Sequence, residues 1–74
     1  MKEILGRTFV AGELTRQVFD YLKSKGLTAT GYSGGVNGVF DSGYFNGKLS
    51  EQDAERLRRE NNLAVSVYEL EVVA

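Results

Sequence analysis

Side chains that could take part in catalysis are few in this sequence, and they lie in its middle. Asp41 is the only acid between residues 26 and 47, and the groups that a fold-back of this segment would bring near it are Ser33, Ser42, Tyr32 and Tyr44. General acid–base catalysis needs a second positioned group and an enclosing pocket, and a chain of 74 residues seldom forms one. The Asp-Ser-Gly run at 41–43 is also common turn chemistry. The sequence therefore predicts a protein that is not an enzyme.

The residue types that are absent exclude several other chemistries. The chain has no His and no Cys, which removes the commonest zinc ligands, the thiol nucleophile and the side chain that titrates near neutral pH. We therefore expect no metal and no cofactor. Nine Lys and Arg against ten Asp and Glu give a net charge of -1, which provides no general attraction to nucleic acid. The apolar runs are too short for a signal peptide or a membrane span, so we expect a cytoplasmic protein without a membrane partner.

The segment between residues 26 and 47 holds seven of the nine glycines and four of the eight aromatic residues. Its run at 31–38 is superficially similar to a phosphate-binding loop, but no helix and no Lys-Ser or Lys-Thr pair follows. Asn37 and Gly38 between two valines instead indicate a β-hairpin, because a type I′ turn needs positive φ at both central residues. Rings would then cover glycines. The expected cross-strand pairs are Gly35 with Phe40, Tyr32 with Gly43, and Gly31 with Tyr44.

The chain before this segment predicts a strand and then a helix. Residues 4–11 alternate, with Leu5, Phe9 and Ala11 on one face and Thr8 among the residues on the other, which is typical of a largely buried strand. Gly12 should end the strand. Residues 13–25 carry apolar side chains at helical spacing. We expect that helix to end in a Schellman motif formed by Gly26 and Leu27.

The chain after it predicts the same two kinds of element in reverse order. Residues 51–61 read as a helix with Ser50 as its N-cap and a thin apolar stripe of Ala54 and Leu57. Residues 63–73 form the longest predicted strand. Their apolar alternation changes sides near Tyr68, which a bulge or a central position in the sheet would explain.

The predicted fold is α+β, a single domain over residues 1–74 with the order βαββαβ. This order is that of the ferredoxin-like split βαβ arrangement, in which two helices lie on one face of an antiparallel four-stranded sheet. The chain has nothing left to cover the other face, which is the first candidate for a binding or self-association surface. The last strand could also extend the sheet into a homodimer if it lies at an edge.

The aromatic residues of the central segment are candidates for contact with a partner. Neighbouring residues of a strand face opposite ways, so Tyr44 and Phe45 cannot both be buried under the helices. The arginines at 56, 58 and 59 could pair with nearby acids, as Glu55 with Arg59, or contact a phosphate or an acidic patch on a partner. The candidate partner-binding residues are Tyr32, Asn37, Phe40, Tyr44, Phe45, Arg56 and Arg59.

Two segments bear a faint similarity to the RNA-recognition motif. These are residues 8–12 on the first predicted strand and Gly43 with Tyr44 on the third, and they resemble the two RNA-stacking segments of that family, which also has this element order. The sequence departs from the family pattern, since Ser42 stands where a basic residue is expected and Asn46 where the second stacking aromatic is expected. Binding of single-stranded nucleic acid or nucleotide is therefore the alternative function.

The leading hypothesis is a small protein-binding module of the inhibitor or adaptor type. Tyr, Phe and Asn with little charge suit an interface that is partly apolar and partly hydrogen-bonded. Small domains without metal or titrating chemistry are typical of phage anti-defence inhibitors, an analogy of size and composition. We expect docking on a larger protein or nucleoprotein complex through the Gly/aromatic hairpin and the open sheet face, with direct binding of nucleic acid second.

Overall fold

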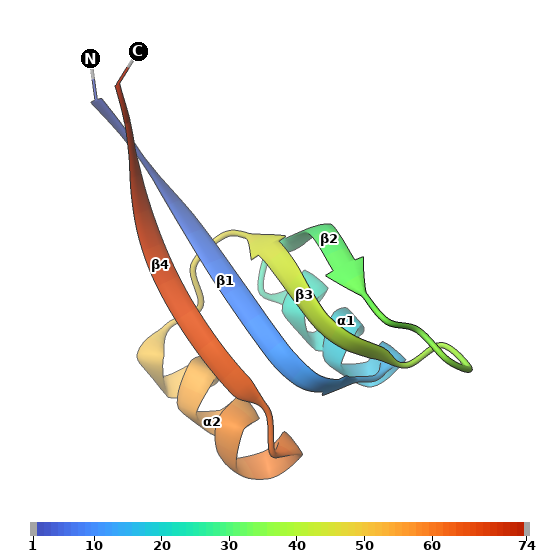
Figure 1. The fold of residues 1–74 in the computed structure, drawn as a ribbon. Coiled ribbons are helices and arrows are strands. Elements are labelled where there is room, and N and C mark those ends of the chain that lie inside the picture. Colours follow the sequence, from blue (N-terminus) through green and yellow to red (C-terminus); the bar gives the residue numbers. More distant parts are fainter. Residues whose placement is uncertain (1, 74) are drawn as a thin grey trace.

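The computed structural model describes the backbone of residues 2–73 and the side chains of residues 5–71. Its elements are β1 (Lys2–Leu14), α1 (Arg16–Ser24), β2 (Thr28–Ser33), β3 (Phe40–Asn46), α2 (Glu51–Asn61) and β4 (Ala64–Val73). The strands form one open antiparallel sheet in the order β2-β3-β1-β4 (Figure 1). The expected α+β class and element order are confirmed. The narrower ferredoxin-like assignment stays a prediction.

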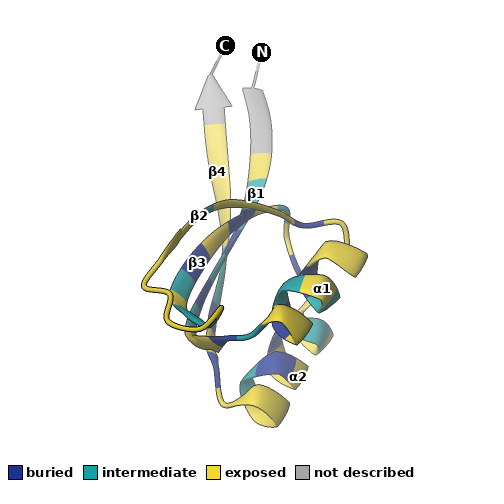
Figure 2. Ribbon diagram, turned by 90° about the vertical axis from the view of Figure 1, so that its right-hand side faces the viewer, coloured by how far each residue is buried: buried dark blue, intermediate teal, exposed yellow. Residues whose placement is uncertain are grey.

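Both helices pack on the same side of the sheet, and no helix of the described chain covers the other side (Figure 2). Burial of apolar surface between the helices and the sheet drives this arrangement. The buried apolar side chains are Val10, Leu14, Val18, Leu22, Leu27, Phe45, Leu49, Ala54, Leu57, Leu63 and Val65.

The first strand is longer than expected and the first helix is shorter. β1 continues to Leu14, and α1 begins only at Arg16. Gly12 has a φ of +122°, and the register of β1 with β3 shifts just beyond it, so the chain bends at this glycine without leaving the sheet. Thr15 then caps α1, because its side chain accepts a hydrogen bond from the N–H of Val18 at 3.4 Å.

The end of α1 confirms the expected Schellman motif. Gly26 has a φ of +86°, which glycine adopts without strain. The N–H of Leu27 donates to the carbonyl of Leu22 at 3.1 Å, and the N–H of Gly26 donates to the carbonyl of Lys23 at 3.0 Å. These bonds satisfy two carbonyls that the helix end would leave unpaired, and they turn the chain toward β2.

The second helix has the expected bounds and the expected N-cap. Ser50 accepts a hydrogen bond from the N–H of Asp53 at 3.2 Å, and Asn62 ends the helix with a left-handed φ of +53°. The buried residues of α2 are Ala54 and Leu57, as its thin apolar stripe predicts. None of the helices within residues 2–73 is long and apolar enough to span a membrane.

The hairpin between β2 and β3 has the predicted register. Val36 and Val39 exchange backbone hydrogen bonds of 3.0 and 3.1 Å around Asn37 and Gly38, whose φ angles are +56° and +79°. A Cβ atom added at residue 35 would lie 2.9 Å from the Phe40 ring, so this ring does cover a glycine. Tyr32 is also paired with Gly43 and Gly31 with Tyr44, but here the expected cover by the paired ring is wrong. A Cβ added at residue 31 would meet nothing within 4 Å, and one added at residue 43 would meet Leu14 and Phe45.

The change of apolar face in the last strand has a cause that differs from both expectations. β4 is an edge strand, not a central one, and its register with β1 is continuous, without a bulge. Val65 is buried, whereas Tyr68 and Leu70 are exposed. Since β1 pairs with β3 only from Arg7 onward, the outer parts of β1 and β4 leave the body as a two-stranded ribbon (Figure 1). The apolar residues change sides because the strand runs out of the core.

Candidate functional site

The uncovered side of the sheet, which we call the open face, is built by the strand register. Residues that lie opposite each other in antiparallel strands point to the same side of the sheet. Phe9 on β1 is opposite Tyr44 on β3, and Arg7 is opposite Asn46 on β3 and Tyr68 on β4. The register also places these residues on the open face: Leu5, Ala11, Gly31, Ser33, Ser42, Ala64, Ser66 and Leu70.

Aromatic and aliphatic side chains form a strip along the open face. The ring centroids of Phe9 and Tyr44 are 4.6 Å apart with planes inclined by 43°. Tyr44 is 50% exposed and Tyr68 is 47% exposed. Leu5 and Leu70, which are directly opposite each other on the ribbon, are also exposed. The strip thus continues from the centre of the sheet onto the ribbon.

Arg7 lies within this strip. Its Nε atom is buried without a hydrogen-bond partner, and no ion pair joins its guanidinium to another of the residues 5–71. Among the described residues that the register assigns to the open face, it is the only charged one. An unpaired guanidinium beside aromatic rings is a donor for a carboxylate or phosphate group, because such charge-assisted hydrogen bonds are among the strong ones.

The structure separates the predicted hairpin residues. Tyr44 lies on the open face, whereas Phe45 is 2% exposed in the core, so one of the two neighbours is buried, as expected. Tyr32 and Phe40 lie on the helix side, where both rings contact Phe19 of α1 at centroid distances of 6.0 and 5.5 Å. Asn37 is exposed at the hairpin tip. These residues therefore do not form one continuous surface.

The arginines of α2 lie on the side of the sheet away from the open face (Figure 2). Arg56 pairs with Glu60 at 3.2 Å. Arg58 pairs with Glu55 at 3.2 Å and donates two hydrogen bonds to a backbone carbonyl on β4. The expected pair of Glu55 with Arg59 is therefore wrong, because Arg58 takes the acid, and Arg59 forms no ion pair with another described residue.

The residues predicted to bind a partner did not include Arg7, Tyr68, Leu5 or Leu70. Alternation within residues 4–11 did place Leu5 and Phe9 on one face, and Arg7 shares that face by the same period of two. The sequence alone therefore already placed Arg7 on the same face as Phe9. Tyr68 could be placed beside it only once the pairing of β4 with β1 was known.

The side chains that could take part in catalysis do not form one group, because Tyr32 and Tyr44 lie on opposite sides of the sheet. Ser33 and Ser42 share a hydrogen bond of 2.7 Å between their hydroxyl oxygens and are paired across the hairpin. The carboxylate of Asp41 packs against Gly34, where an added Cβ would lie 2.4 Å from Oδ2. Within the described residues, no group of three or more acids could hold a metal ion. The contact of Asp41 with Gly34 fits the turn chemistry expected for the Asp-Ser-Gly run.

Comparisons with family models, curated proteins and solved structures gave no match to this chain.

Proposed function

We propose that this protein is a non-enzymatic binding module that docks on a larger protein through its open face. The observation that supports this most directly is a row of exposed apolar side chains on a sheet face without a helix: Leu5, Tyr44, Tyr68 and Leu70. A contiguous apolar patch of a few hundred Å² on a small protein is typical of an interaction site. Apolar side chains lose unfavourable contact with water when a partner covers them.

The chemistry of the open face suits a protein partner. Tyrosine, phenylalanine and arginine are enriched in the buried centres of interfaces, whereas lysine and glutamate are depleted there. Arg7 shares the open face with Phe9, Tyr44 and Tyr68, and small polar residues flank this group. We therefore infer a partner surface that is mostly apolar and carries one acidic side chain for Arg7.

The open face includes fewer of the predicted partner-binding residues than the sequence suggested. Tyr44 is on the open face, but Tyr32 and Phe40 lie on the helix side, so one flat partner surface does not reach all three. Arg56 and Arg59 on α2 are also not part of the open face. The biological role that fits is an inhibitor or adaptor in the cytoplasm, of the kind found among phage anti-defence proteins.

The test is affinity capture from a lysate of the native host, with tagged wild-type protein and single-residue variants. Tyr44→Ala and Tyr68→Ala should each reduce the recovery of a stoichiometric partner at least about tenfold, as hot-spot residues do. Tyr32→Ala is the matched control, since Tyr32 is 59% exposed on the opposite side of the sheet. It should leave recovery unchanged.

Melting curves of the three variants separate binding from folding. Each tyrosine is about half exposed, so the three melting temperatures should stay close to that of the wild type. A partner whose recovery is the same with Tyr44→Ala and Tyr68→Ala as with wild type would show that the open face is not the docking surface.

Single-stranded nucleic acid is the second candidate, supported by one contact. Phe9 and Tyr44 lie side by side on the two central strands, with Arg7 next to them, which is an arrangement on which bases could stack. Fluorescence anisotropy with a labelled 12-nucleotide uridine strand tests this. Binding that weakens with salt and is lost in Tyr44→Ala, together with nuclease-sensitive capture, would place nucleic acid before protein.

A further inference from the structure

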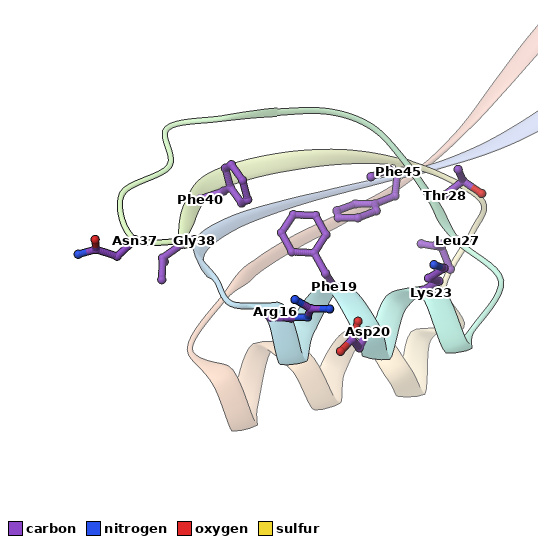
Figure 3. Close-up of a pocket in the computed structure, with 12 residues that line it drawn as sticks. Arg16, Phe19, Asp20, Lys23, Leu27, Thr28, Asn37, Gly38, Phe40 and Phe45 are labelled. Carbon is purple, nitrogen blue, oxygen red and sulfur yellow. The ribbon is translucent and has the colours of Figure 1, made fainter.

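A groove lies on the helix side of the sheet, between α1 and the tip of the β2–β3 hairpin (Figure 3). Its volume is about 810 Å³, within the range of small-molecule sites. Phe19 of α1, Phe45 of β3 and Leu27 supply apolar side chains on one side, and Val39 and Phe40 supply them on the hairpin side. We call this the hairpin groove.

Aromatic rings dominate the walls of the hairpin groove. The ring centroid of Phe19 is 5.5 Å from that of Phe40 with an interplanar angle of 79°, and 5.6 Å from that of Phe45 with an angle of 56°. Phe19 and Phe40 are only partly buried, so parts of both rings face the groove. Aromatic pairs favour such edge-to-face contacts, and a further ring placed against the exposed parts of Phe19 and Phe40 would extend the pattern.

The rim of the groove on α1 carries net positive charge. Arg16, Asp20 and Lys23 line it in successive turns (Figure 3). Neither Arg16 nor Lys23 forms an ion pair with another described residue, whereas the nearby Lys25 pairs with Asp53 at 3.6 Å. Two cations and one acid leave one positive charge available beside the apolar walls.

We propose that the hairpin groove binds a small aromatic carboxylate. The apolar walls receive the ring, against the exposed parts of Phe19 and Phe40, and the carboxylate meets Arg16 or Lys23 at the rim. A neutral aromatic molecule would leave the cations unpaired, and an aromatic cation would meet a rim of its own sign. This site lies on the opposite side of the sheet from the open face, so it stands or fails independently of the proposed protein docking.

The test is titration of the ¹⁵N-labelled protein with 2-naphthoate, followed by amide chemical shifts. The probe should shift amides of residues 19–23, 27–29 and 37–40 and leave those of residues 64–68 unchanged. Two probes with the same ring system serve as controls, neutral 2-naphthamide and cationic 2-naphthylmethylammonium. We expect 2-naphthoate to bind about threefold to fivefold more tightly than the amide, the scale of one exposed ion pair, and the cation to bind most weakly.

Variants of the rim residues test the charge preference without disturbing the core. Arg16→Gln combined with Lys23→Gln should bind 2-naphthoate and 2-naphthamide equally, since both side chains are exposed and their loss leaves the apolar walls intact. Arg59→Gln on α2 removes a cation remote from the groove and should keep the full preference. Equal binding of the three probes by the wild type, no shifts at the groove amides, or shifts confined to the open face would each overturn the proposal.

Discussion

Thr8 is the only polar residue that is fully buried in the described part of the chain, and its hydroxyl group connects β1 to the turn before α2. The hydroxyl oxygen donates to the carbonyl of Gly47 at 3.0 Å and accepts the N–H of Leu49 at 3.4 Å. Buried polar groups are nearly always paired, and here one side chain satisfies two backbone groups. Thr8 thus attaches the segment between β3 and α2 to the first strand.

Replacing Thr8 with valine keeps its shape and removes both hydrogen bonds. We expect Thr8→Val to lower the free energy of unfolding by about 1–3 kcal/mol, because the carbonyl at 47 and the N–H at 49 lose their partner away from water. Urea denaturation measures this. Thr30→Val is the matched control, since Thr30 also donates to a backbone carbonyl, that of Tyr44 at 3.2 Å, but is exposed. Equal losses in the two variants would contradict the role of burial.

The two helices are joined by Asp53, which lies in the first turn of α2. Its carboxylate accepts hydrogen bonds from the hydroxyl groups of Ser50 and Tyr21, each at 3.0 Å, and pairs with Lys25. These contacts, that of Ser50 foremost, hold the pKa of Asp53 below its usual value. Burial, followed by the hydrogen bond to Asp53, raises the pKa of Tyr21 above its usual value. Both shifts favour the pair of ionised carboxylate and neutral phenol between the helices.

The lowered pKa of Asp53 makes stability depend on pH in the acid range. The folded protein favours the ionised carboxylate of Asp53 more than the unfolded chain does, and this preference stabilises the fold. The stabilisation is present above the pKa that Asp53 has in the unfolded chain, and it is lost as pH falls through the lower pKa of the folded protein. The urea midpoint should fall between about pH 5 and pH 2, and it should fall less in Asp53→Asn. Asp20→Asn, on the solvent side of α1, should follow the wild-type profile. Identical profiles for wild type and Asp53→Asn would exclude this linkage.

At the scale of the whole molecule, the body and the ribbon differ in how they are supported. β1 is flanked by both β3 and β4 from Arg7 onward, but before that residue it pairs with β4 alone. Lys48 forms an ion pair and a hydrogen bond with Glu69 where the ribbon leaves the sheet, and this contact lowers the pKa of Glu69. Two-stranded ribbons are marginally stable in water without further packing.

Amide hydrogen exchange should therefore vary along β4. We expect the amide of Leu70 to exchange at least about tenfold faster than that of Ser66, because both lie opposite β1 residues whose backbone faces β4, and ribbon segments open without unfolding the core. Nuclear magnetic resonance of the protein in D₂O measures the rates. Light scattering on the same sample distinguishes the 8.2 kDa monomer from a homodimer paired through the β4 edge. Uniform protection of β4 in a monomer would contradict the expectation.

Local signals in the sequence determined much of this fold. Asn37 and Gly38 fixed the hairpin register, Gly26 fixed the end of α1, and Ser50 fixed the start of α2, because each acts through hydrogen bonds within a few residues of itself. The uncovered sheet face also followed from element order alone. These features depend on backbone geometry that the local residue types nearly dictate.

Only the tertiary structure decided which side chains share a surface. The continuation of β1 past Gly12 depends on its pairing with β3, and the outward position of Tyr68 depends on β4 leaving the core. The placement of Arg7 beside Tyr68, and of Tyr32 on the side opposite Tyr44, likewise needs the register between distant strands. Pairing between residues far apart in the chain is set by the burial of the whole core, which no short stretch of sequence contains.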